Sequence, residues 1–169
     1  MLILYSAIIL FSVVLDQITK YVALKQLKPI LSHEFIPGLI EFHFHTNDGI
    51  AWGMLGGMRW VFIPISIIAI LVVMFLLFRY RKKFSSLLGI SLSMIVGGGI
   101  GNQIDRIVYG EVVDFLYFQF FDFPIFNVAD CFVTIGAALA LISILFIDKE
   151  LLSDDLKDNG KKAENKEND

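Results

Sequence analysis

The sequence is poor in cysteine and has no positive charge at its N-terminus. Cys131 is the single cysteine among 169 residues, so the chain cannot form an internal disulfide. No histidine is near it in sequence, which favours an inert thiol over a nucleophile. No Lys or Arg precedes the first apolar run, and Asp16 lies within that run, so we expect it to be retained and not cleaved as a signal peptide.

Long apolar runs account for most of the chain. Hydrophobic residues make up 56% and the mean hydropathy is +0.71, which excludes a soluble domain. Four runs have the ~17–25 residues needed to cross a bilayer: residues 2–24, 60–78, 84–104 and 131–147. The sequence therefore predicts a membrane all-α fold, a four-helix transmembrane bundle in a single domain at residues 1–148, followed by a disordered, charged tail at residues 149–169.

The basic residues predict the orientation of this bundle. Four of them lie together between the second and third runs, at Arg79, Arg81, Lys82 and Lys83. The positive-inside rule places this connection in the cytoplasm. Four spans then put both termini inside, and the connections at residues 25–59 and 105–130 outside.

Three polar residues interrupt the first run: Asp16, Gln17 and Lys20. Asp16 and Lys20 are four residues apart, so they can form an ion pair on one helix face. One interpretation is a helix end anchored at the outer interface by snorkelling side chains. The other is a charged stripe that supports an active site at the outer surface.

After Pro29 the pattern changes from helical to alternating. Residues 39–45 place apolar and polar side chains on opposite faces, which predicts a half-buried strand entered through a Pro37-Gly38 turn. Its polar face consists of Glu41, His43 and His45. These side chains could hold a zinc ion, but no further ligand is evident, and a solvated strand face is the preferred interpretation.

Residues 47–53 then end the strand with turn-forming and apolar residues. Asn47 and Gly49 supply turn chemistry, and Trp52 suits the membrane interface. The Asn47 side chain could equally fix a substrate backbone by hydrogen bonds. Several glycines near Trp52 suggest a mobile lid.

The third run ends in glycines and a polar cluster. Small residues such as Gly97 to Gly99 and Gly101 allow close helix packing in a bilayer. Asn102, Asp105 and Arg106 follow them at the outer mouth. Arg106 could clamp a carboxylate, contact a phosphate headgroup or pair with Asp105.

Two further acids flank the Phe-rich connection after this run. Asp114 lies among Val, Phe and Leu, where a carboxylate is costly and calls for a function. Asn127 is a plausible N-cap of the fourth helix, which places Asp130 in its first turn. Asp130 could be a simple helix-start acid, or the two carboxylates could share one proton and activate a water.

Five short motifs in order resemble lipoprotein signal peptidase, the signal peptidase II family. The resemblance covers about residues 10–147. The motifs are Asp16-Gln17 with Lys20, Asn47-x-Gly49-x-Ala51, Gly98-x-x-Gly101-Asn102-x-x-Asp105-Arg106, Val112-x-Asp114-Phe115 and Phe126-Asn127-x-Ala129-Asp130.

The resemblance implies an aspartyl endopeptidase of the bacterial plasma membrane that uses no metal or nucleotide. Asp114 and Asp130 match its catalytic dyad. Its substrates are prolipoproteins whose cysteine already carries diacylglycerol, and cleavage falls just before that cysteine. Membrane lipids and globomycin-type inhibitors are the other expected partners; no nucleic acid is expected, and the chain should act as a monomer.

The resemblance also implies residues that bind substrate or support the site, together with a small extracytoplasmic sheet and a lid between the first two spans. The residues expected in these roles are Asp16, Lys20, Asn47, Gly49, Asn102, Asp105, Arg106, Asn127 and Ala129 from the motifs, together with Trp52, which lies outside them.

Two other classes of protein compete with the protease. A proton- or ion-coupled transporter also uses intramembrane acids and arginines, but here the acids gather at one surface and no internal repeat is evident. A purely structural membrane subunit leaves Asp114 unexplained.

Overall fold

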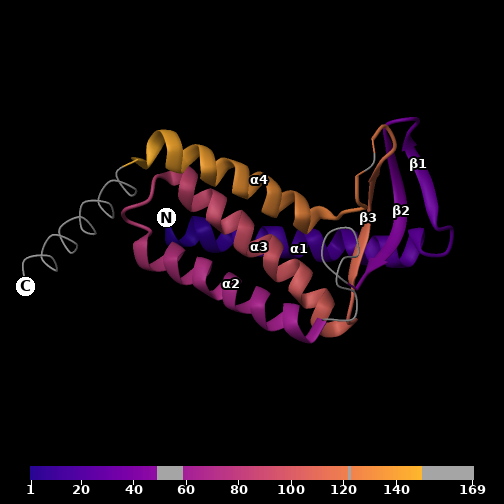
Figure 1. The fold of residues 1–169 in the computed structure, drawn as a ribbon, viewed down its shortest axis with the longest axis horizontal. Helices are drawn as coiled ribbons and strands as arrows, with labels where there is room; N and C mark the ends of the chain where they lie inside the picture. The colour runs from indigo at the N-terminus through magenta and orange to yellow at the C-terminus, as the bar shows by residue number, and fades with distance from the viewer. Residues whose placement is uncertain (49–58, 122, 150–169) are drawn as a thin grey trace, which may run out of the picture.

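A computed structural model describes residues 1–48, 59–121 and 123–149. Its four long helices are apolar enough to cross a membrane, which confirms the predicted helical membrane fold with a small sheet (Figure 1). They are α1 (Leu2–Val22), which continues as the π-helical η1 (Ala23–Leu27); α2 (Arg59–Tyr80); α3 (Ser86–Val108); and α4 (Val128–Ile142), which continues as η3 (Ser143–Ile147).

Helix α3 is the centre of the bundle and packs against each of the other three helices. Its glycines allow this close approach, as the sequence predicts. A Cβ on Gly97 would lie 2.6 Å from the Cβ of Ser12 in α1, and one on Gly101 would lie 2.5 Å from the Oδ2 of Asp16. The backbone of α3 therefore lies directly against the polar side of α1.

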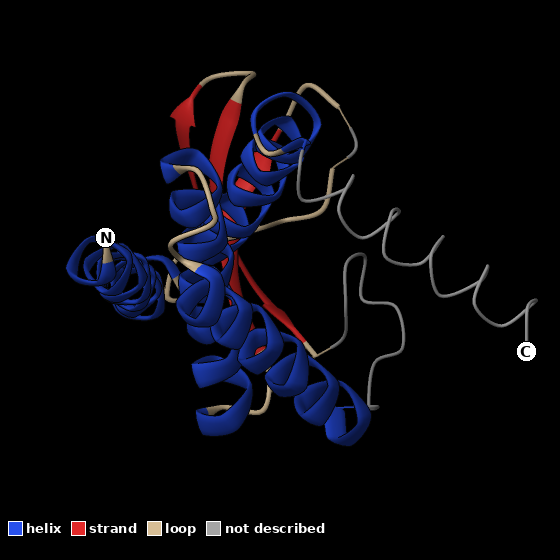
Figure 2. Ribbon diagram, turned by 90° about the vertical axis from the view of Figure 1, so that its left-hand side faces the viewer, coloured by secondary structure: helices blue, strands red, loops and turns tan. Residues whose placement is uncertain are grey.

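A three-stranded antiparallel sheet lies across one end of the bundle, behind the helices in the view of Figure 2. Its strands are β1 (Ser32–Ile36), β2 (Ile40–Asn47) and β3 (Val112–Phe118), in the order β1-β2-β3. The predicted turn joins β1 to β2, with Gly38 at φ +71°. Strand β2 confirms the strand predicted from the alternating sequence, and its residues are half-buried except for the exposed His45. Strand β1, all of whose residues are exposed, was not predicted.

A small apolar core joins the sheet to the end of α1. Ala23 and Leu27 of η1 pack with Val113 and Phe115 of β3. Phe42 and Phe44, from the predicted apolar face of β2, pack against them. The sheet is thereby fixed to the bundle, and β3 lies beside the helix ends.

Two of the helix boundaries that differ from those predicted affect the polar cluster. Helix α3 extends to Val108, so Asp105 and Arg106 lie in its last turns and not in an outer connection. Helix α4 begins at Val128, because Asn127 caps it with a reciprocal pair of hydrogen bonds to Asp130. The predicted N-cap at Asn127 is confirmed, whereas the span start that hydropathy placed at residue 131 is three residues late.

Candidate active site

Asp114 and Asp130 come from different elements and line one cavity. Asp114 is in β3 with only 2% of its surface exposed, and Asp130 is in the first turn of α4. The cavity has a volume of about 510 Å³, and its polar wall also includes Asn47, Asn102 and Arg106. The structure therefore brings together two carboxylates that are 16 positions apart in the sequence.

Asn127 connects the two aspartates. Its Nδ2 donates to Asp114 Oδ1 at 2.6 Å, and its Oδ1 accepts from the backbone N–H of Asp130 at 3.0 Å. Its own backbone N–H donates to Asp130 Oδ2 at 3.1 Å. The side chain is completely buried, so the same hydrogen bonds that cap α4 also fix the position of one carboxylate relative to the other.

Asn102 of α3 holds the other oxygen of Asp130. Its Nδ2 donates to Asp130 Oδ1 at 2.8 Å, while its Oδ1 accepts from Lys20 Nζ at 2.8 Å. An ammonium group can only donate, so Lys20 determines which end of the Asn102 amide is the acceptor. The amide N–H₂ must then face Asp130.

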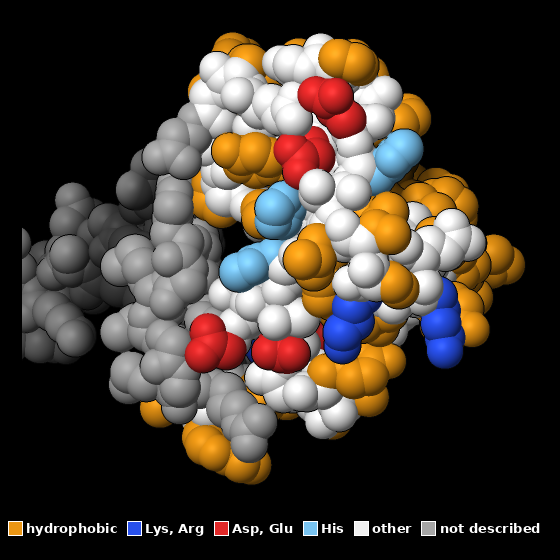
Figure 3. Space-filling model, turned by 90° about the vertical axis from the view of Figure 1, so that its right-hand side faces the viewer, with side chains coloured by type: hydrophobic (Ala, Val, Ile, Leu, Met, Phe, Trp, Pro, Cys, Tyr) orange, Lys and Arg blue, Asp and Glu red, His pale blue; other side chains and the backbone are white. Residues whose placement is uncertain are grey.

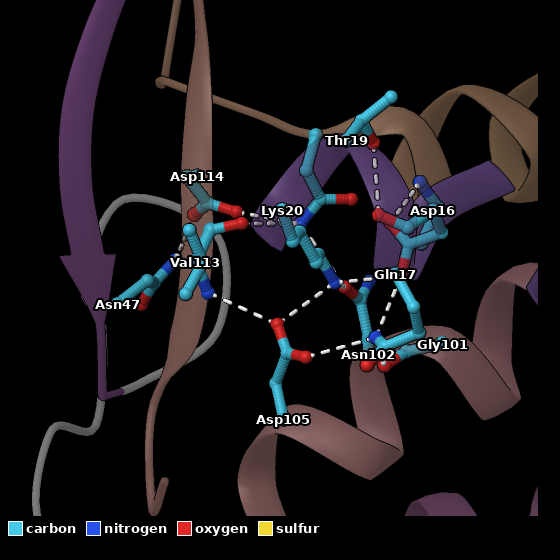
Figure 4. A network of polar contacts seen from close by, with 12 residues as sticks. Asp16, Gln17, Thr19, Lys20, Asn47, Gly101, Asn102, Asp105, Val113 and Asp114 are labelled. Carbon is cyan, nitrogen blue, oxygen red and sulfur yellow. Dashed lines mark hydrogen bonds and ion pairs between the residues drawn. The ribbon is translucent and has the colours of Figure 1, made fainter. Parts of the chain in front are cut away.

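Lys20 is the centre of a buried ion cluster (Figure 4). Its ammonium lies 3.0 Å from Asp16 Oδ2 and 2.9 Å from Asp105 Oδ2, and all three side chains are almost fully buried. Gln17 Nε2 donates to Asp16 and Asp105, which ties the two carboxylates together. The predicted Asp16–Lys20 pair therefore faces the bundle interior and does not snorkel to the interface.

The two carboxylates of this cluster also hold the backbone beside the two site aspartates. Asp105 Oδ2 accepts from the N–H of Val113 at 3.1 Å, and Asp16 Oδ1 accepts from the N–H of Ala129 at 2.9 Å. Val113 and Ala129 immediately precede Asp114 and Asp130. One buried cation thereby organises the backbone on both sides of the cavity.

Burial controls the protonation of Asp114. Removal of its carboxylate from water raises its pKa to about 7, and the nearby charge of Asp130 adds to the rise. Hydrogen bonds from Asn127 and Asn47 act in the opposite direction. Asp114 can therefore hold a proton near neutral pH, as a pair of carboxylates that share one proton requires.

The remaining predicted site residues have mixed outcomes. Asn47 Nδ2 lies 3.4 Å from Asp114 Oδ2, and Arg106 lines the cavity. Arg106 does not pair with Asp105, whose cation is Lys20, because adjacent side chains of a helix point in different directions. Gly49 and Trp52, and with them the suggested lid, lie outside the described residues.

Sequence reasoning missed two contributors to the site. One is Gln17, whose side chain bonds to both Asp16 and Asp105. The spacing of residues in the sequence gives no sign of the contact with Asp105. The other is the apolar part of the cavity lining, which comes from the end of β3, the connection before α4 and α4 itself. Its members include Phe118, Phe123, Pro124, Phe126 and Ile135. The density of phenylalanine in this connection was a usable signal.

The polar face of β2 does not resemble a metal site. His43 Nδ1 contacts Glu41 Oε1 at 3.0 Å, and the other oxygen of Glu41 accepts from Gln119 Nε2 at 2.8 Å. The Gln119 bond is the main reason that the pKa of Glu41 lies below its ordinary value. Within the described ranges, no three His, Cys, Asp or Glu side chains are grouped to hold an ion.

Comparisons with known proteins identify the family of this chain. A family model described as Signal peptidase (SPase) II matches residues 8–146. The chain belongs to the signal peptidase II family. Lipoprotein signal peptidases from Listeria monocytogenes serotype 4a and Listeria innocua serovar 6a are each 38% identical over 148 residues, which covers 86% of this chain and 96% of each relative.

Solved structures share the fold of this signal peptidase II chain. Two structures of bacterial membrane enzymes match it with TM-scores of 0.78 and 0.74, at 37% and 36% identity. The matches cover 83% and 85% of this chain, and 87% and 93% of those chains. The chain is thus a multi-pass membrane protein that is related to peptidases over most of its length.

The ion cluster predicts a large effect of Lys20→Met. This change leaves Asp16 and Asp105 buried without their cation, which typically costs about 3–5 kcal/mol of unfolding free energy. Thermal unfolding in detergent should show the loss, and peptidase activity should fall with it. Lys82→Met is the matched control, because Lys82 is exposed. A Lys20→Met protein as stable as the control would contradict the assigned cluster.

Proposed function

We propose that this chain is a membrane-embedded aspartic endopeptidase that removes the signal peptide from diacylglyceryl-modified prolipoproteins, cleaving just before the lipidated cysteine. The observation that carries the proposal is the placement of Asp114 and Asp130 in one cavity, joined through Asn127, in a chain of the signal peptidase II family. The transporter hypothesis has no support from the relatives, which are peptidases.

The hydrogen bonds give the two aspartates different roles. Both oxygens of Asp130 accept bonds, from the Asn102 amide and the Asn127 backbone N–H, and its carboxylate lies at a helix N-terminus. These contacts stabilise a negative charge, so Asp130 is assigned as the base. Asp114, whose pKa burial raises to about 7, is assigned as the acid.

In this mechanism a water molecule between the carboxylates attacks the scissile carbonyl. Asp130 takes the proton that the water loses, and Asp114 donates its own proton to the developing oxyanion. When the tetrahedral intermediate collapses, the proton on Asp130 passes to the leaving amine as the C–N bond breaks. The hydroxyl proton returns to Asp114, and the pair regains its single proton.

The apolar wall of the cavity suits a lipidated substrate. Phe123, Pro124 and Ile135 line the same cavity as the polar residues. Acyl chains attached to a cysteine need such a surface, while the peptide backbone needs donors such as Arg106 and Asn47. Globomycin-type lipopeptides combine the same two features and are proposed to compete for this cavity in a monomeric enzyme.

The role assignment predicts that Asp114→Asn and Asp130→Asn each abolish cleavage. Asparagine keeps the shape of the side chain but cannot exchange the proton, so the loss should be at least ~10²-fold. The measurement is cleavage of a diacylglyceryl-modified prolipoprotein by purified variants that retain normal thermal unfolding. Cys131→Ala and added chelator are the controls and should leave the rate unchanged. Substantial activity in either aspartate variant would rule out the dyad.

The pKa of Asp114 predicts how the rate depends on pH. Above about pH 7 this carboxyl loses the proton that it must donate, so the rate should fall as the pH rises through that value. Asn47 donates to Asp114 and favours its ionised form, so Asn47→Ala should raise the pKa and shift the alkaline limb to higher pH. A pH–rate profile measures both effects. A limb that stays in place, or moves to lower pH, would contradict the role of Asp114.

The positive-inside argument supports a site on the outer side of the membrane, with both termini in the cytoplasm. In a Cys131→Ala background, an impermeant thiol reagent added to intact cells should label His43→Cys, whose parent side chain is 44% exposed. It should not label Lys82→Cys, in the basic connection after α2, until the cells are opened. External labelling of Lys82→Cys would reverse the orientation.

A further inference from the structure

A second cavity lies on the other side of the segments that carry the two aspartates. It is an open groove of about 680 Å³, within the ~300–1,000 Å³ common for ligand sites. Phe115 and Val128 line it, and each is one or two residues from Asp114 or Asp130. Neighbouring residues of a strand point to opposite faces, and residues two apart in a helix point in nearly opposite directions. The groove is therefore separate from the proposed catalytic cavity.

The groove lies along the C-terminal end of α1, which the proposed orientation places at the outer side of the membrane. Its helical wall runs from Ile18 past the end of the membrane span at Leu27 to Ile30. Ile18, Val22 and Ile30 are 56%, 43% and 59% exposed, so the wall is open to the surroundings along its length. Its floor is the apolar core at Leu27 and Phe115. The groove thus continues from hydrocarbon depth to the membrane surface.

Positive charge gathers where the groove reaches that surface. His33 is part of the lining, and Lys25 and Lys28 are next in sequence to the lining residues Gln26 and Leu27; the first acid after them is Glu34. The ammonium groups of Lys25 and Lys28 lie 5.8 and 5.7 Å from the ring centres of Tyr21 and Phe44. On this end of the molecule, basic side chains stand among hydrophobic ones (Figure 3). Such a pairing matches an anionic headgroup above an acyl chain.

We propose that the groove binds an anionic glycerophospholipid of the outer leaflet. One acyl chain lies along Ile18 and Val22 against Phe115, and the phosphate faces Lys25 and Lys28. This site is distinct from the one proposed for the substrate, and the binding does not depend on the peptidase activity. The site suits a bilayer lipid, because its long apolar slot matches an acyl chain and the basic residues at the interface match an anionic headgroup.

A lipid in this groove supports the segments that carry the aspartates. Phe115 is tied to the connection before α4, because its backbone N–H donates to the carbonyl of Phe126 at 3.0 Å. Val128 is the first residue of α4. Phe115 is already buried, so a lipid in the groove covers mainly the half-buried Val128 at the start of α4 and removes apolar surface from contact with the surroundings there. The bound lipid should therefore raise the thermal stability of the protein.

The test compares phosphatidylglycerol with phosphatidylcholine of the same acyl chains, each titrated into the purified full-length protein in detergent. Phosphatidylglycerol should raise the unfolding temperature saturably and remain bound in native mass spectra, whereas phosphatidylcholine should do so only at higher concentration. The double variant Lys25→Gln/Lys28→Gln should weaken phosphatidylglycerol binding roughly thirtyfold, the effect of two lysine contacts. Lys82→Gln/Lys83→Gln makes the same charge change at the opposite end of the bundle and should preserve the effect.

A third variant tests the slot itself. Val22→Trp places a bulky ring in the groove at a half-exposed position and should block the stabilisation without change at Lys25 or Lys28. If the Val22→Trp variant does not fold, the lysine variants alone provide the test. Equal effects of the two lipids, or full phosphatidylglycerol binding by Lys25→Gln/Lys28→Gln, would overturn the proposal. Displacement of the bound lipid by a diacylglyceryl peptide would also overturn it, because the groove would then belong to the substrate.

Discussion

The structure depends on one buried cation. Lys20 lies inside the bundle at membrane depth, where a charge persists only if it is fully paired. Its partners Asp16 and Asp105 come from different helices, and each also holds a backbone N–H that immediately precedes one of the two site aspartates. The cost of burying an ammonium group is thus offset by contacts that fix a strand and a helix start. A protein without Lys20 would keep its membrane spans, but Asp16 and Asp105 would lose the cation that holds both of them beside the site.

Asn127 shows how structure and chemistry use the same atoms. As the N-cap of α4 it satisfies backbone groups that a helix end leaves unpaired in an apolar environment. The rest of its amide reaches Asp114, so the cap and the link between the carboxylates are one side chain. Asn102 plays a matching part from α3, with its amide direction set by Lys20. Two neutral amides therefore place donors on two acids without adding a further charge to the site.

Hydropathy and the cost of buried acids predicted much of this arrangement. The four spans, the Asp16–Lys20 pair and the N-cap at Asn127 follow from local spacing, which the sequence displays directly. The partner of Asp105 does not, because it depends on how α1 packs against α3: of the alternatives open for Arg106, the pair with Asp105 is not formed, and Lys20 takes that place. Strand β1 was missed because its residues are exposed on both faces and show no alternation. Contacts between distant segments are where the sequence is least informative.

The position of Asp16 and Lys20 on a single helix has a consequence for how the protein enters the membrane. Helix α1 is synthesised before α3 and α4, when Asp105 and Ala129 do not yet exist. A lone lysine or aspartate would hinder transfer of this segment into lipid. Because the two are one helical turn apart, they neutralise each other within the segment itself and lower the cost of insertion. Asp16 and Lys20 each serve as the counter-ion of the other until α3 and α4 have been synthesised and supply their further partners.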